Sequence, residues 1–162
     1  MQPWQSIGTH RFRIEEDLVF VIAQGEISAE EIITLCEHLF LIYQKYGHVY
    51  EIVDATAGGS MSAEARRRYA EWFRSHPFQI QAVVFGANGL LRTVFALITN
   101  AMRLLGRSEV QTHFVATESE ARAFVAHHRA SHPKPPPPRP RKPPNTPHGA
   151  GRGTWMYRVD DG

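Results

Sequence analysis

The chain has 162 residues, 43% of them hydrophobic and 21% charged, which is ordinary for a globular domain that buries a core. Its net charge of +2 is unevenly divided, because residues 133–162 carry six Lys or Arg against two Asp and residues 1–132 are left with a net charge of −2. A slightly acidic body argues against a nucleic-acid-binding domain, which would usually show a basic face, and the single cysteine, Cys36, excludes an internal disulfide.

The first third of the chain predicts a hairpin followed by a long helix. Thr9–Ile14 alternates apolar and charged residues and Leu18–Ala23 is apolar almost throughout, so we expect an antiparallel pair at one edge of a sheet. Ser28 and Glu31 match the S-x-x-E capping box that begins a helix, and Gly47 is the expected end of that helix.

The stretch after the next strand is the candidate site. Val49–Val53 is short, β-branched and mostly apolar, as a central strand should be, and every residue from there to Ser60 is small or acidic. We expect an exposed loop here, because open α/β sheets bind ligands and partners at the carboxyl ends of their strands. The residues expected to form this binding loop are Asp54, Thr56, Gly58, Gly59, Ser60 and Ser62.

The polar members of this loop also have structural interpretations. An Asp at a strand end, such as Asp54, commonly accepts hydrogen bonds from the amides of the following turn. Ser60 and Ser62 are helix-capping residues by default. A phosphate on either would lie at a helix N-terminus, where the dipole and free amides favour it, so both are candidate phosphorylation sites.

The rest of the chain alternates helices and strands. Ser62 is the predicted N-cap of a helix over Ala63–Ser75, and Thr117 with Glu120 caps a final helix. The element order is β-β-α-β-α-β-α-β-α, which predicts an α/β fold with a single, mostly parallel sheet and an antiparallel edge strand. The other expected elements are strands over Ile80–Phe85 and Val110–Val115 and a helix over Leu90–Leu105.

The helix over Leu90–Leu105 is apolar around most of its circumference. Packing on a sheet requires an apolar stripe only somewhat over 100° wide, so this helix has a further apolar face to bury. A neighbouring helix, a second subunit in a homodimer, or a small apolar ligand would each cover it. The residues expected on this interface are Leu91, Phe95, Ile98 and Met102.

The element order, with Asp54 closing the third strand and Phe85-Gly86 closing the fourth, resembles the STAS fold of bacterial anti-sigma-factor antagonists, especially the SpoIIAA-like branch. The resemblance covers about residues 8–131 and implies a non-enzymatic regulatory module that docks a protein partner. Relatives of this branch are compared with lipid-carrying CRAL-TRIO domains. The alternative implied is therefore a carrier or binder of a small apolar or lipid-like ligand.

The antagonist family also implies a phosphorylation switch. There, a Ser in an Asp-Ser-Ser-Gly segment at the start of the second helix is phosphorylated to control partner binding. The corresponding region here is Gly59-Ser60-Met61-Ser62-Ala63, which keeps a Ser at the helix start and lacks the preceding Asp and the following Gly.

Several kinds of site and signal are missing from the sequence. The nine histidines show no H-E-x-x-H motif, and there is no G-x-S-x-G or G-x-x-x-x-G-K-[ST] motif. We therefore expect no metal, no cofactor and no enzymatic activity. No secretory signal is visible and no apolar stretch reaches the roughly 20 residues of a spanning helix, so we expect a cytoplasmic protein without a transmembrane segment.

The C-terminal part differs in composition. Residues 133–147 contain nine prolines, four basic residues and no acidic residue, which is typical of an extended linker without a core. We expect an α/β domain over residues 1–131, a disordered basic linker over 132–152 and a short apolar segment over 153–162. In that segment Trp155, Tyr157 and Val159 alternate, which is typical of a strand-like motif that docks on a sheet edge, or of a frayed terminus.

Overall fold

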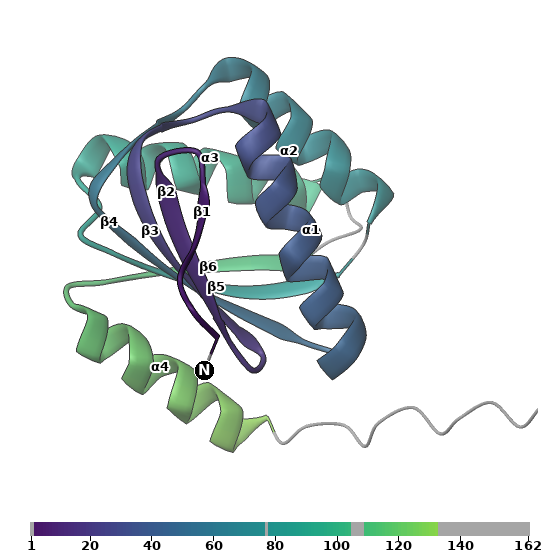
Figure 1. The fold of residues 1–162 in the computed structure, drawn as a ribbon, viewed down its shortest axis with the longest axis vertical. Coiled ribbons are helices and arrows are strands. Elements are labelled where there is room, and N and C mark those ends of the chain that lie inside the picture. The colour runs from purple at the N-terminus through teal and green to yellow at the C-terminus, as the bar shows by residue number, and fades with distance from the viewer. Residues whose placement is uncertain (1, 77, 105–108, 133–162) are drawn as a thin grey trace, which may run out of the picture.

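The sheet of this protein is built in sequence order, β1-β2-β3-β4-β5-β6. The computed structural model describes residues 2–76, 78–104 and 109–132, which form this sheet and four helices (Figure 1). The elements are β1 (Gln5–Ile7), β2 (His10–Glu15), β3 (Leu18–Ile27), α1 (Ala29–Tyr46), β4 (Val49–Met61), α2 (Ala63–Ser75), β5 (Gln79–Phe85), α3 (Gly89–Leu104), β6 (Glu109–Val115) and α4 (Glu118–Ser131).

The direction of the strands confirms the predicted fold class. The strands β1, β2 and β3 pair antiparallel, and β3, β4, β5 and β6 pair parallel. Each parallel connection runs through one helix to the neighbouring strand, always in the same direction across the sheet. Right-handed crossovers of this kind place α1, α2 and α3 on one face, and α4 lies on the other face against β4 and β5 (Figure 1).

Alternation along β4 assigns its side chains to the two faces of the sheet. Val49 and Val53 belong to the core under α1, α2 and α3. Tyr50 and Ile52 point to the opposite face and pack in a smaller core with α4. Glu51 has the same parity as Val49 and Val53, so the strand carries a carboxyl group into the larger core.

The helix ends follow the capping signals in the sequence. In α1 the Ser28 hydroxyl accepts from the Glu31 backbone N–H at 3.3 Å, the Glu31 carboxylate accepts from the Ser28 N–H at 2.7 Å, and Gly47 forms the C-cap. The Ser62 hydroxyl caps α2. The start of α3 was not predicted from a cap: the Asn88 side chain accepts from the Leu91 N–H at 2.9 Å.

Two predictions about strands are wrong. The strand β1 was not predicted, because three residues carry no periodic pattern, yet Gln5–Ile7 pairs along β2. A loop was predicted after Val53, where β4 in fact continues to Met61. That extension pairs with the second half of β3, through Gly25 with Gly58 and Ile27 with Met61, after register shifts. Small residues predict a loop by composition, but here a parallel neighbour satisfies their backbone groups.

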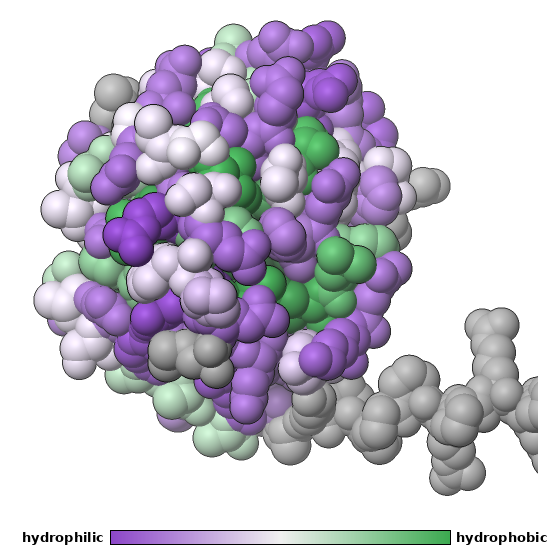
Figure 2. All heavy atoms as spheres, viewed as in Figure 1, coloured by the Kyte–Doolittle hydropathy of each residue, from purple (hydrophilic) through white to green (hydrophobic). Residues whose placement is uncertain are grey.

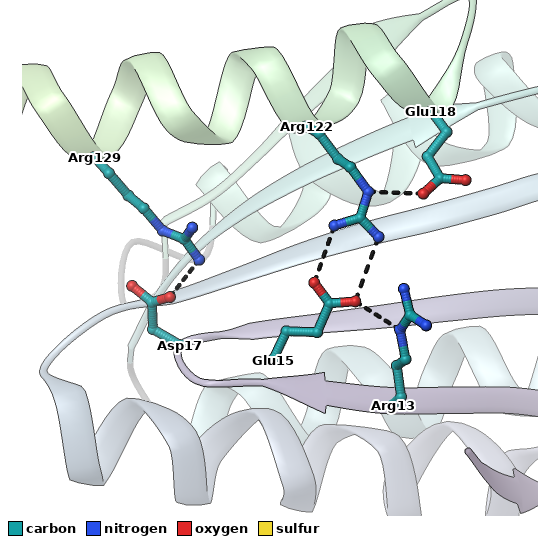
Figure 3. Close-up of polar contacts among 6 residues, drawn as sticks. All are labelled: Arg13, Glu15, Asp17, Glu118, Arg122 and Arg129. Carbon is teal, nitrogen blue, oxygen red and sulfur yellow. Dashed lines mark hydrogen bonds and ion pairs between the residues drawn. The ribbon is translucent and has the colours of Figure 1, made fainter. Parts of the chain in front are cut away.

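Ion pairs tie α4 to the β2–β3 hairpin (Figure 3). The Arg122 guanidinium donates to both carboxylate oxygens of Glu15, at 2.9 and 3.3 Å, and to Glu118 at 2.7 Å. The Arg13 Nε donates to Glu15 at 2.6 Å. Hydrogen bonding to Arg122 is the largest cause that lowers the pKa of the Glu15 carboxyl, so Glu15 is a carboxylate at neutral pH.

The visible surface is mostly hydrophilic, with apolar side chains exposed in separate patches (Figure 2). Leu41 on α1 is 61% exposed and Leu97 on α3 is 65% exposed. Among the helices that the structure describes, none has the length and hydrophobicity to cross a membrane. The expected linker over 133–152 and the motif of Trp155, Tyr157 and Val159 lie outside the described residues.

Candidate functional site

A cavity of about 90 Å³ lies between the sheet and the layer of α1, α2 and α3. Most of its lining is apolar, supplied by side chains such as Val21, Leu35, Leu39 and Val53. The space exists because the sheet face beneath the helices carries several residues with little or no side chain, which leaves a gap that the helices do not fill. These residues are Ala23, Gly25, Ala55, Gly58 and Ala82.

The cavity reaches the surface near the ends of β3 and β4. Of its lining residues, Gly25 and Ser60 are exposed, whereas those on the centre of the sheet, such as Ala82, are buried. The open end therefore lies at the carboxyl ends of two parallel strands, which is where open α/β sheets bind ligands.

Glu51 is the acidic residue of this lining, and it is only 9% exposed. Its neighbours in register are Val19 on β3 and Ala82 on β5, so it is flanked by apolar side chains. In the described part of the chain, no hydrogen bond or ion pair reaches this carboxyl group. Burial raises the pKa of the Glu51 carboxyl to about 7.

Two other titratable groups near Glu51 stay protonated at neutral pH. Burial is the largest cause that raises the pKa of the Cys36 thiol on α1, and the Glu51 carboxyl adds to it. Burial also raises the pKa of the Tyr69 hydroxyl on α2, with Cys36 and Glu51 adding to it. The thiol is therefore not a thiolate nucleophile, and the Tyr69 side chain, which lines the cavity, is a hydrogen-bond donor.

His10 on β2 lines the cavity close to its open end and is 4% exposed. Its Nδ1 accepts the backbone N–H of Gln24 at 3.0 Å, so the neutral ring carries its proton on Nε2. This Nε2 is buried without a hydrogen-bond partner among the residues that the structure describes, and the Glu31 carboxylate lies 3.7 Å from it. The lining thus combines a large apolar area with a few polar groups.

The residues predicted for the binding loop are divided between different places. Gly58 and Ser60 line the cavity. Asp54 does not line it, and its Oδ1 accepts from the Thr56 N–H at 2.9 Å, which is the structural role expected of an Asp at a strand end. Gly59 continues β4, and Ser62 is the N-cap of α2, where its hydroxyl accepts from the Ala65 N–H at 3.0 Å.

The apolar interface predicted on α3 also contributes to the cavity. Leu91 is buried and lines it, and Phe95 lines it while packing 6.2 Å from the ring of Phe114. The side chains of Ile98 and Met102 lie outside the described part of the structure. The structure therefore places one end of the predicted loop and one turn of the predicted apolar helix around the same space.

Glu51, Tyr69 and His10 line the cavity but were not predicted as site residues. Glu51 had a signal, since it is the single acidic residue in the otherwise apolar run Val49–Val53, which was expected to be a buried strand. Tyr69 and His10 had none, because an aromatic residue on a helix and a histidine at the start of a strand are common in cores.

A second hollow, of about 320 Å³, lies between α4 and the β2–β3 hairpin. Its cationic lining residues are Arg122 and Arg129, and both already hold carboxylates: Arg122 pairs with Glu15, and Arg129 with Asp17 (Figure 3). Both cationic groups of this hollow are therefore already paired with carboxylates of the hairpin, and we place the candidate site in the first cavity. In residues 2–76, 78–104 and 109–132, no group of three His, Cys, Asp or Glu is arranged to hold a metal ion.

No protein-family model and no curated protein matches the chain. Among solved structures, it is similar to a protein of the DUF3478 family with a SpoIIAA-like fold from Shewanella loihica PV-4. The identity is 16% over 70% of this chain and 89% of that chain, with a TM-score of 0.46. It is also similar to the anti-sigma factor antagonist SpoIIAA in its unphosphorylated form, with 14% identity over 76% of this chain and 98% of that one and a TM-score of 0.44. Both likenesses concern the fold alone.

Proposed function

We propose that this protein is a non-enzymatic binding protein that holds a small, largely apolar molecule in the cavity between the sheet and α1, α2 and α3. The observation that carries the proposal is the cavity itself, which opens at the carboxyl ends of β3 and β4 and is lined by Leu91 and Phe95 of α3. An apolar pocket with a few convergent polar groups is the usual form of a small-molecule site.

The size of the cavity limits its occupant. A cavity of about 150 Å³ lined by apolar side chains is known to take up benzene or xenon. At about 90 Å³, this one has room for a group of a few heavy atoms. A longer apolar chain would have to extend through the open end, past Gly25 and Ser60.

Xenon is a suitable first probe because it is neutral, apolar and small. In two-dimensional amide NMR spectra of the full chain under xenon pressure, we expect shifts concentrated at residues that line the cavity. Ala82→Leu, which places a larger side chain beside Glu51 on the sheet, should abolish these shifts. Ala96→Leu, at an exposed position of α3, is the matched control and should keep them.

Ala82→Val makes a smaller change at the same position and should weaken the xenon-induced shifts in part. This variant keeps the test valid if Ala82→Leu folds poorly. An absence of xenon shifts in the native chain would contradict the proposal, as would shifts that persist unchanged in both Ala82 variants.

The second candidate function is docking of a protein partner over the end of β4 and the start of α2, controlled by phosphorylation. The observation in its favour is local to Ser62. The hydroxyl caps α2, and Arg66, one turn later, donates from its Nη1 to the Met61 carbonyl at 2.6 Å, so a cation lies beside the helix N-terminus. A phosphate on Ser62 would gain both the free amides and this guanidinium.

Ser60 is the weaker of the two phosphorylation candidates. Its hydroxyl donates to the Glu26 carboxylate at 2.8 Å, so a phosphate there would meet a negative charge. In protein purified from its own host, we expect an added mass of about 80 Da, mapped by peptide sequencing to Ser62 and lost in Ser62→Ala. A phosphate mapped to Ser60, or no phosphate under any growth condition, would contradict this switch.

A further inference from the structure

We infer that the occupant of the cavity is a small amine, whose apolar body fills the space under α3 and whose ammonium group pairs with the carboxyl group of Glu51. This inference rests on the proposed function, and it names the chemical class of the ligand.

The first support is that the Glu51 side chain lies in the core without a protein partner. Glu51 is only 9% exposed, it lines the cavity from the centre of the sheet, and the described residues supply its carboxyl with no hydrogen bond or ion pair. Buried carboxyl groups in folded proteins are normally hydrogen-bonded or paired. A ligand that brings N–H donors into the cavity would supply the missing partner.

The second support is the charge of the lining. Among the described residues around the cavity there is neither Lys nor Arg. An anionic ligand, such as a fatty acid or a phospholipid headgroup, would therefore meet Glu51 with no Lys or Arg to offset the repulsion. The unpartnered Nε2 of His10 lies 3.7 Å from the Glu31 carboxylate, so that end of the lining also carries a negative charge. A cationic ligand would instead be attracted, because its charge would pair with the Glu51 carboxylate among apolar side chains.

The usual objection to a buried ion pair is the loss of solvation of both partners. Here the fold has already taken most of the Glu51 side chain out of water, so the further loss of solvation on binding falls mainly on the amine. The site is preorganised in this sense, and the ligand gains an attraction that is stronger than the same pair would have at the surface.

The inference also predicts a pH dependence. An ammonium ion pairs with the carboxylate form of Glu51, whose pKa is raised to about 7 by burial. Amine binding should therefore be strong at pH 8 and fall as Glu51 becomes protonated, by about 30-fold at pH 5.5. The other titratable groups facing this region are Cys36, Tyr69 and His10. The first two have raised pKa values and stay protonated over this range.

Three probes of nearly equal size separate the ligand classes: isobutylamine, 2-methylpropan-1-ol and 2-methylpropanoate. In NMR titrations of the full chain at pH 8, we expect the amine to bind at least about tenfold more tightly than the alcohol, and the carboxylate not to bind. Glu51→Gln should lose this preference and the pH dependence, while His10 remains the same in both proteins. Glu37→Gln, on the exposed side of α1, is the matched control and should keep both.

The outcomes distinguish this inference from the proposed function. Suppose that xenon enters the cavity but the alcohol binds as well as the amine, or that Glu51→Gln keeps the preference for the amine. The cavity would then still be a binding site, but the inference that its ligand is an amine would be wrong. Tighter binding of the carboxylate would overturn the inference in the same way. If xenon does not enter the native chain and none of the three probes binds, the proposed function itself is overturned.

Discussion

Replacing Glu51 with Gln should make the protein progressively more stable than the native chain as the pH rises. The pKa of the Glu51 carboxyl is raised by burial from 4.5 to about 7 in the folded state. The folded state therefore favours the protonated form. Its contribution to stability is present below pH 4.5 and is lost as the pH rises towards 7. The stability difference between Glu51→Gln and the native chain should grow by about 2.5 kcal/mol between pH 5 and pH 8.

Urea unfolding of both proteins at pH 5, 6, 7 and 8 measures this difference. Comparing the two proteins at each pH cancels the titration of every other group. Glu37→Gln, at an exposed position of α1, should show no such growth. A difference between Glu51→Gln and the native chain that stays constant with pH would mean that the folded protein already stabilises the Glu51 carboxylate, and the reason for expecting a cationic ligand would disappear.

The destabilisation of the folded state by the ionised Glu51 carboxylate is relevant to function. A hydrophobic residue or Gln at position 51 would suit a buried strand better, since Val49 and Val53 on the same face are both apolar. Groups that destabilise a fold and titrate near neutral pH are concentrated at functional sites, where ligand binding offsets their cost. An amine in the cavity would offset the cost of burying the Glu51 carboxylate. Saturating amine should then stabilise the native chain more at pH 8 than at pH 5.

The fold was predictable because its signals are local. The capping box at Ser28, the N-cap hydroxyl of Thr117 and the glycine after α1 mark helix ends by short-range hydrogen bonds, and the structure contains those bonds. The alternation of helices and strands then restricts the sheet to a mostly parallel arrangement in which α1, α2 and α3 share a face. Each of these steps depends on residues close together in the sequence.

The site was predictable only in pieces. The sequence marked the segment around Gly58 and Ser60 and the turn of helix around Leu91 and Phe95, each for its own reason. That both line one cavity follows from the order of the strands and from the small side chains of the sheet face, such as Ala82, whose effect on packing depends on what lies opposite. The loop was mispredicted for a related reason, because the backbone partner of β4 beyond Asp54 is the far half of β3.

The continuation of β4 past Asp54 can be tested through the turn that follows β5. Gly86 has a φ of +73°, and a Cβ atom added there would lie 2.8 Å from the backbone nitrogen of Thr56 and 3.0 Å from its Cα. Thr56 belongs to β4, and its N–H is held by Asp54, so this backbone cannot easily move. Gly86→Ala is expected to reduce the free energy of unfolding by about 3 kcal/mol, from the left-handed backbone and the close contact together.

Gly47, at the end of α1, is the matched control. Its φ is +77°, and an added Cβ would meet no atom within 4 Å, so Gly47→Ala should cost only the left-handed conformation, about 1 kcal/mol. Urea unfolding measures the loss of unfolding free energy in each variant. The difference between the two losses reports the close contact at Gly86, because both variants place an alanine in the left-handed conformation. Equal losses of unfolding free energy would mean that a Cβ atom at position 86 makes no close contact with the backbone of β4. A loss about 2 kcal/mol larger for Gly86→Ala would show that the backbone of Thr56 is fixed as strand, which holds Gly58 and Ser60 at the open end of the cavity.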